Sequence, residues 1–138
     1  MNLLTALDPN ATKKAPDHFD VGDLVDVHTW ITEGDKRRIQ VFTGLVIRIN
    51  HGRGVSGSFT VRRIVAGEGV ERVFPFHSPN VDKVEVTRYG KPRRARLYYL
   101  RQRVGKDALK VKELVSGRRR SRAEKASAEE AAAWSSSE

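Results

Sequence analysis

Arginines and tyrosines crowd residues 88–106, in the segment RYGKPRRARLYYLRQRVGK. The planar guanidinium of arginine can bind two phosphate oxygens at once, and it loses less hydration on binding than the ammonium of lysine. Tyrosine rings between arginines can stack on unpaired bases. If the segment is extended, Arg94, Arg96 and Tyr98 lie on one side and Tyr99 on the other. At least one tyrosine is expected in the core, so the arginines carry the hypothesis of phosphate binding.

The charge of the 138-residue chain is unevenly distributed. Its total of +9 comes from 26 Lys and Arg against 17 Asp and Glu. Residues 1–35 carry a net −5, residues 36–120 a net +16 and residues 121–138 a net −2, and residues 88–120 alone carry 13 basic against two acidic residues. A block of one sign repels itself, so we favour a bound polyanion over a merely solvated surface.

Two further basic clusters extend the hypothesis. Lys36, Arg37 and Arg38 precede a long apolar alternation. They form either a solvated turn or an auxiliary phosphate clamp, and the sequence supports both equally. Arg62 and Arg63 are adjacent in an expected strand, so they point to opposite faces and at most one of them lies on a given surface.

Gly52, Gly54 and Gly57 form the string GxGxxG, which binds dinucleotides when it opens a helix. Here SFTVRRIV follows, with the period of two that is typical of a strand, so we expect a loop between strands. Arg53 and the backbone amides of this loop can still contact phosphate. His77, beside Ser-Pro, either braces a turn or donates a hydrogen bond to a sugar or base.

The sequence favours neither catalysis nor a cofactor nor a metal. It contains no cysteine, which excludes disulfides, thiolate zinc sites and cysteine nucleophiles. The four histidines lack metal-ligand spacing, and no nucleophile elbow, Walker loop or HExxH motif is present. The start of the chain lacks a basic opening segment and a long apolar run, so we expect a soluble protein without membrane contact.

Alternating apolar residues predict five strands, over residues 24–31, 39–49, 59–65, 70–76 and 81–90. In the first strand, one side is expected to hold Val25, Val27, Thr29 and Ile31, and the other Asp26, His28 and Trp30. Gly44 suggests a bulge or sharp bend, and Pro75 suggests an edge strand or bulge. Short strands with glycine turns predict an all-β antiparallel unit, a small SH3-like or OB-like barrel that is closed or partly open.

After Pro92 the pattern changes. A final strand is expected through residues 97–100, followed by a helix from about Asp107. The tail, rich in Ala, Ser and Glu, is expected to be disordered or to fold into a helix on binding. The expected organisation is an N-terminal segment (1–16), a barrel with its basic closing segment (17–100), a basic C-terminal extension (101–117) and a low-complexity tail (118–138).

Several ordered strings resemble one protein family. They are VGDLVDVH at 21–28, EGDKRRIQ at 33–40, RIQVFTGLVI at 38–47, SFTVRRI at 58–64, GEGVERVFPFHSP at 67–79 and GKPRRARLYYLR at 90–101. Together they resemble the bacterial large-subunit (50S) ribosomal protein number nineteen family over roughly residues 17–112. Pro92 stands where the family usually has a small aliphatic residue, and it removes a backbone donor there.

The resemblance implies a cytoplasmic, non-enzymatic SH3-like barrel that binds large-subunit ribosomal RNA. It implies a place at the subunit interface, a bridge to small-subunit ribosomal RNA and contact with neighbouring large-subunit proteins, with no small-molecule substrate. The family's basic signature maps onto Lys91, Arg93, Arg94, Arg96, Tyr98, Tyr99 and Arg101. The residues predicted to bind RNA are Lys36, Arg37, Arg38, Arg53, Arg62, Arg63, His77, Arg88, Lys91, Arg93, Arg94, Arg96, Tyr98, Arg101, Arg103, Lys106, Lys110 and Lys112.

Two other classes compete with this interpretation. A free transcription or translation factor could carry the same barrel, but it would cycle off the ribosome. An RNA-modifying enzyme would need a cofactor loop or a catalytic cluster, and the sequence offers neither.

Overall fold

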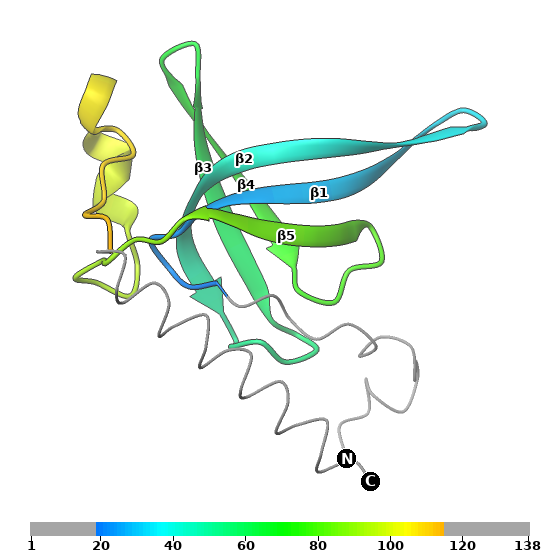
Figure 1. Cartoon of the computed structure of the whole chain (residues 1–138), viewed down its shortest axis with the longest axis horizontal. Helices are drawn as coiled ribbons and strands as arrows, with labels where there is room; N and C mark the ends of the chain where they lie inside the picture. The colour runs from blue at the N-terminus through cyan, green and yellow to red at the C-terminus, as the bar shows by residue number, and fades with distance from the viewer. Residues whose placement is uncertain (1–18, 115–138) are drawn as a thin grey trace, which may run out of the picture.

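The structure, a computed structural model, describes residues 19–114 as an antiparallel sheet followed by two short 3₁₀ helices (Figure 1). The strands are β1 (Leu24–Glu33), β2 (Lys36–Asn50), β3 (Ser58–Val65), β4 (Glu68–Pro75) and β5 (Val81–Arg88), in the order β4-β3-β2-β1-β5. The sheet is curled but not closed, with β4 and β5 at its edges. This confirms the predicted all-β, barrel-like fold and the edge position of Pro75. The segments 1–16 and 118–138 lie outside the described residues.

Two tight turns fix the register of the hairpins. Pairing of Glu33 with Lys36 leaves a two-residue turn that begins with Gly34 at φ 59°. Pairing of Val65 with Glu68 leaves Ala66 at φ 51° and Gly67 at φ 80°. Two left-handed residues are what a type I′ turn requires, and its twist suits a hairpin.

The bulge in β2 lies at Ile47 and not at Gly44. Gly44 pairs regularly with β1, whereas the register with β3 shifts between Val46 and Arg48. A Cβ on Gly44 would lie 2.6 Å from the carbonyl oxygen of Arg62, so this glycine is needed where β2 and β3 approach closely. Leu45 and Ile47 face one side of β2 and Val46 faces the other, as the alternation of a strand requires.

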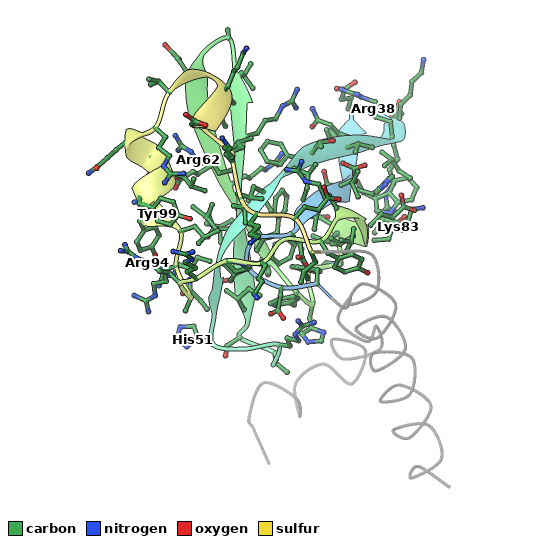
Figure 2. All side chains as sticks on the ribbon, turned by 60° about the vertical axis from the view of Figure 1, so that its left-hand side comes forward. Arg38, His51, Arg62, Lys83, Arg94 and Tyr99 are labelled. Carbon is green, nitrogen blue, oxygen red and sulfur yellow. The ribbon has the colours of Figure 1, made fainter. Side chains whose placement is uncertain are left out.

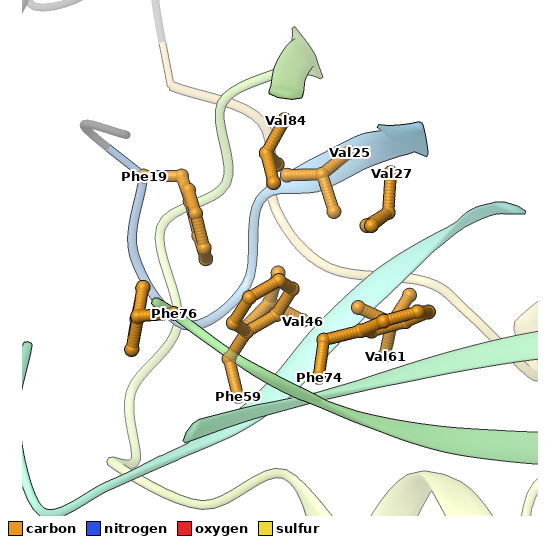
Figure 3. Packing of buried hydrophobic residues seen from close by; sticks show 9 residues of the cluster. All are labelled: Phe19, Val25, Val27, Val46, Phe59, Val61, Phe74, Phe76 and Val84. Atoms are coloured by element: carbon orange, nitrogen blue, oxygen red, sulfur yellow. The ribbon is translucent and has the colours of Figure 1, made fainter. Parts of the chain in front are cut away.

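The main core fills the inside of the curled sheet (Figure 3). As predicted, β1 buries Val25, Val27 and Thr29 on one side, whereas Ile31, expected on the same side, is only partly buried. The rings of Phe19 and Phe59 meet edge to face, with centroids 4.8 Å apart, the arrangement that aromatic quadrupoles favour. The main core cluster consists of Phe19, Val25, Val27, Val46, Phe59, Val61, Phe74, Phe76 and Val84.

A second core cluster lies on the opposite face of β2. Leu45 and Ile47 pack there against Leu97 and Leu100, and all four side chains are fully buried. Leu97 and Leu100 belong to residues 89–114, which we call the C-terminal arm. The arm lies beside the sheet (Figure 1). The middle of β2 is therefore buried on both faces.

The predicted strand over residues 97–100 is wrong. Tyr98–Gln102 form the 3₁₀ helix η1, and the amide of Leu97 donates to the carbonyl of Ile47 at 2.9 Å. Side chains three residues apart align in a 3₁₀ helix, so Leu97 and Leu100 both reach the second core cluster. The single-sided row of Arg94, Arg96 and Tyr98 that an extended chain would make is therefore lost.

The predicted helix from Asp107 is also wrong. A single 3₁₀ turn, η2 (Gly105–Asp107), is followed by chain whose Glu113 bridges to Gly90. The amide of Lys91 donates to the carbonyl of Lys112 at 2.7 Å, so backbone groups that a helix would pair internally are paired across the arm.

A buried carboxylate joins the arm to the start of β1. Asp23 is fully buried and accepts hydrogen bonds from the amides of Asp20 and Gly90, both at 2.9 Å. A Cβ on Gly90 would lie 1.9 Å from the carbonyl oxygen of Gly22, so the two backbones cross in contact. Within residues 19–114, no helix is long and apolar enough to cross a membrane.

Candidate nucleic-acid interface

Residues of the C-terminal arm line a basic cavity of about 760 Å³ that is widely open to solvent. Its charged lining residues are all cations, and all six are exposed: Lys91, Arg93, Arg94, Arg103, Lys110 and Lys112. The other lining residues are Pro92, Tyr99, Gln102 and Val111. A concave, low-dielectric surface lined by one sign of charge focuses the electrostatic potential and concentrates polyanions.

Pairing within the arm brings two separate basic runs together. The hydrogen bond from Lys91 to Lys112 places residues 91–94 beside residues 110–112. The buried Leu97 and Leu100 fix the 3₁₀ helix between them against β2. The cations of the cavity therefore stand on backbone that is held at both ends, which reduces the entropy lost when they bind a ligand.

The two tyrosines of the arm have different surroundings. Both pack against the second core cluster but remain partly exposed, so neither is the buried core tyrosine that was expected. The Tyr99 ring lines the cavity, with the guanidinium carbons of Arg94 and Arg103 at 5.6 and 4.7 Å from its centroid (Figure 2). Tyr98 lies outside the cavity lining, with the guanidinium carbon of Arg101 at 4.5 Å from its centroid.

Glu71 on β4 connects the arm to the sheet. Its two carboxylate oxygens accept hydrogen bonds from Nε and Nη2 of Arg101, both at 2.7 Å. One of them also accepts from Nη1 of Arg62 at 3.0 Å. The hydrogen bonds from Arg101 are the main cause that holds the pKa of Glu71 below its usual value; both arginine charges act in the same direction, and partial burial opposes them.

Arg62 and Arg63 point to opposite faces of β3, as predicted. Arg62 is 7% exposed and packs over Gly69, where a Cβ would lie 2.2 Å from its guanidinium. Arg63 is exposed, with its guanidinium carbon 5.9 Å from the centroid of Phe42 on the other face. Burial and pairing leave little of Arg62 accessible to a ligand.

A second basic cluster lies at the tip of the β1–β2 hairpin, far from the cavity (Figures 1 and 2). Lys36, Arg37 and Arg38 are exposed there. Arg38 pairs with Glu33 at 2.8 Å. The guanidinium of Arg37 stacks on Trp30, with its carbon 4.6 Å from the ring centroid, so this side chain is partly ordered before any partner arrives.

Arg53 and His77 brace the loop that carries the three glycines. This loop joins β2 to β3, so the expectation of a loop between strands is confirmed. Arg53 donates to the carbonyl of Phe19, and Nε2 of His77 lies 3.1 Å from the carbonyl oxygen of Arg53. The contact of His77 is with this loop and not with its own turn at residues 77–80, which it was predicted to brace.

The remaining predicted residues are distributed over the arm and β5. Arg96 and Lys106 are exposed outside the cavity, and Arg88 is partly buried opposite Leu24. Gln102 and Glu71 were not among the predicted site residues, and Tyr99 was considered for base stacking but left out of the predicted RNA-binding set. The signal for Glu71 was present, because a two-residue turn at Ala66 and Gly67 sets it directly opposite Arg62.

Comparison with known proteins gives a consistent result. The sequence model of the family described as ribosomal protein L19 matches residues 2–114. The large ribosomal subunit protein bL19 of Rhodopirellula baltica is 62% identical over 104 residues, which cover 75% of this chain and 86% of that protein. Its counterpart in Alkaliphilus metalliredigens is 50% identical over 113 residues, covering 82% and 96%. The similarity thus includes most of the N-terminal segment.

Proposed function

The chain belongs to the ribosomal protein L19 family, and on this premise we propose that it is a structural constituent of the large ribosomal subunit that binds ribosomal RNA through the cationic surface of its C-terminal arm. The observation that carries the proposal is the cavity with six exposed cations and no carboxylate among its lining residues. Proteins of this family are structural components of the ribosome and not enzymes.

The surroundings of each residue narrow the set that contacts RNA. We assign phosphate contacts to the exposed cations of the arm: Lys91, Arg93, Arg94, Arg96, Arg103, Lys106, Lys110 and Lys112. Arg53, Arg63, His77 and Arg88 are secondary candidates at the margin. Arg62, Tyr98 and Arg101 are assigned to the framework, because Glu71 holds both arginines and Tyr98 packs beneath one of them.

The hairpin tip supports a second RNA contact. Lys36, Arg37 and Arg38 lie at the other end of the molecule from the cavity, so one chain presents two cationic surfaces (Figure 2). We propose that the tip reaches small-subunit ribosomal RNA across the subunit interface and contributes to a bridge, while the arm holds large-subunit RNA. Neighbouring large-subunit proteins border the barrel in this arrangement.

The salt dependence of binding tests the arm. Each phosphate contact contributes a slope of about 0.7–0.9 log units of affinity per tenfold change in salt, because bound counterions are released. R93A/R94A is therefore expected to lower the slope for large-subunit ribosomal RNA by about 1.4–1.8 and to weaken incorporation into large subunits. Filter binding at several KCl concentrations measures the slope, and sedimentation measures incorporation.

The double variant R72A/K83A is the matched control for charge. Both residues are exposed and lie outside the proposed contact set, so their removal is expected to leave the slope within error of the parent. An unchanged slope and unchanged incorporation for R93A/R94A would refute the role of the arm.

A further inference from the structure

We propose that the cavity of the arm receives one unpaired nucleotide of the bound RNA, with its base against Tyr99 and its flanking phosphates on the cationic rim. The inference rests on the proposed RNA binding and adds a ligand class for one specific site.

The volume of the cavity is the first argument. At about 760 Å³ this open cavity lies in the range of about 300–1,000 Å³ that is typical of sites for small organic ligands. A single phosphate group would leave most of this space unfilled. A base with its ribose and flanking phosphates uses both the interior and the rim.

The chemistry of the walls is the second argument. Phosphate needs only cations, yet the cavity also has an aromatic ring, the apolar Pro92 and Val111, and the amide of Gln102. Unpaired bases stack on aromatic rings and on guanidinium planes. The edge of a base carries both hydrogen-bond donors and acceptors, and a side-chain amide can pair with both. Tyr99 with Arg94 and Arg103 provides the stacking surfaces, and Gln102 provides the hydrogen-bonding group.

The pairing state of the nucleotide follows from the shape of RNA helices. The major groove of A-form RNA is deep and narrow and the minor groove is shallow, so bases that remain stacked in a duplex do not enter a side-chain cavity. Only a nucleotide in a loop, bulge or single strand can present its face to Tyr99.

Short oligonucleotides test the proposal with the full chain. Fluorescence anisotropy compares labelled hexaadenylate with an abasic hexamer that has the same number of phosphates. Base stacking on an aromatic side chain is worth about 1–3 kcal/mol, so hexaadenylate is expected to bind about 5- to 150-fold more tightly. Y99L is expected to bring this ratio close to one while leaving the abasic affinity nearly unchanged.

Two further variants keep the test sharp. Gln102 is exposed, so Q102A leaves the fold intact and is expected to lower the ratio even if Y99L does not fold. Y98L makes the same chemical change outside the cavity lining and is expected to preserve the ratio. A loss of preference in Y98L equal to that in Y99L would contradict the placement of the base.

Three results would overturn the inference in distinguishable ways. Equal affinity for both hexamers, with tight binding to large-subunit RNA retained, would reduce the cavity to a phosphate site and leave the proposed function standing. Failure of the parent chain to bind large-subunit RNA at all would refute the proposed function as well. If free AMP displaces labelled hexaadenylate as effectively as unlabelled hexaadenylate does, the cavity binds a free nucleotide and not a nucleotide of an RNA chain.

Discussion

Glu71 anchors the arm to the sheet by an ion pair with Arg101. It receives three hydrogen bonds from Arg62 and Arg101, and Arg62 is buried. A buried guanidinium that loses its carboxylate keeps its desolvation cost without compensation. One acidic side chain on an edge strand therefore fixes part of a predominantly cationic arm.

The lowered pKa of Glu71 predicts a specific pH dependence. Its folded pKa lies below the ordinary value near 4.5, so its contribution to stability is complete above that value and is lost as the pH falls through the folded pKa. E71Q is expected to lower the free energy of unfolding by about 1–2 kcal/mol at pH 7, and the difference from the parent should shrink below about pH 4.5. Urea denaturation at pH 7 and pH 3 measures this.

The matched control is E85Q. Glu85 pairs with Lys83 on the exposed face of β5, where solvent screens the interaction. It is expected to change the stability at pH 7 much less than E71Q does. Equal stability of E71Q and the parent at pH 7 would contradict the anchoring role of Glu71.

The second core cluster determines which secondary structure the arm adopts. Leu97 and Leu100 are fully buried against the outer face of β2, while the neighbouring Tyr98 and Tyr99 stay partly exposed. Burial of a leucine is worth about 1.5–3 kcal/mol, more than the propensity differences between local conformations. Packing against β2 therefore selects the 3₁₀ helix.

L100A tests this coupling. Removing the side chain is expected to cost about 2–5 kcal/mol, because it leaves a cavity between the arm and β2. Hydrogen exchange of the Lys91 and Leu114 amides, which bond across the arm, should accelerate more than that of amides in β1. V104A is the control, since Val104 is 81% exposed. Equal effects of the two variants would exclude the second core cluster as the anchor.

The same element shows why the sheet was predictable and the arm was not. The all-β fold and its five strands follow from local alternation and turns. Tyr98 and Tyr99 favour a strand by propensity, and only the contact with β2, some fifty residues away, overrides that preference. The cavity depends on the pairing of Lys91 with Lys112, a register that no periodicity encodes. The cationic residue types, in contrast, were readable directly.

The molecule as a whole places its two cationic surfaces at opposite ends. The arm packs beside the middle of β2, and the β1–β2 hairpin projects in the other direction (Figure 1). From Lys36 at the tip to Gly44, β2 pairs only with β1, and from Leu45 onward it also pairs with β3. β2 thus connects the two proposed RNA contacts, because Lys36 begins it at the tip and its Leu45 and Ile47 pack against the arm.

K36A/R37A tests the proposed division between the two ends. The variant is expected to retain incorporation into large subunits, because the arm is unchanged, and to weaken association of large with small subunits several-fold. Light scattering over a magnesium titration measures the association, with R72A/K83A as the charge-matched control. Association equal to that of the parent would remove the hairpin tip from the bridge.

The hydrogen bond between Asp23 and Gly90 bears on the order in which parts of the chain fold during synthesis. The carboxylate of Asp23 bonds to the amide of Gly90, 67 residues later, and the cavity also needs Lys112 beside Lys91. Contacts so distant in sequence form late, whereas the β1–β2 hairpin closes locally. On a nascent chain the hairpin tip is thus complete long before the arm, and the surface proposed to grip large-subunit RNA is assembled only when nearly all of the described chain has been made.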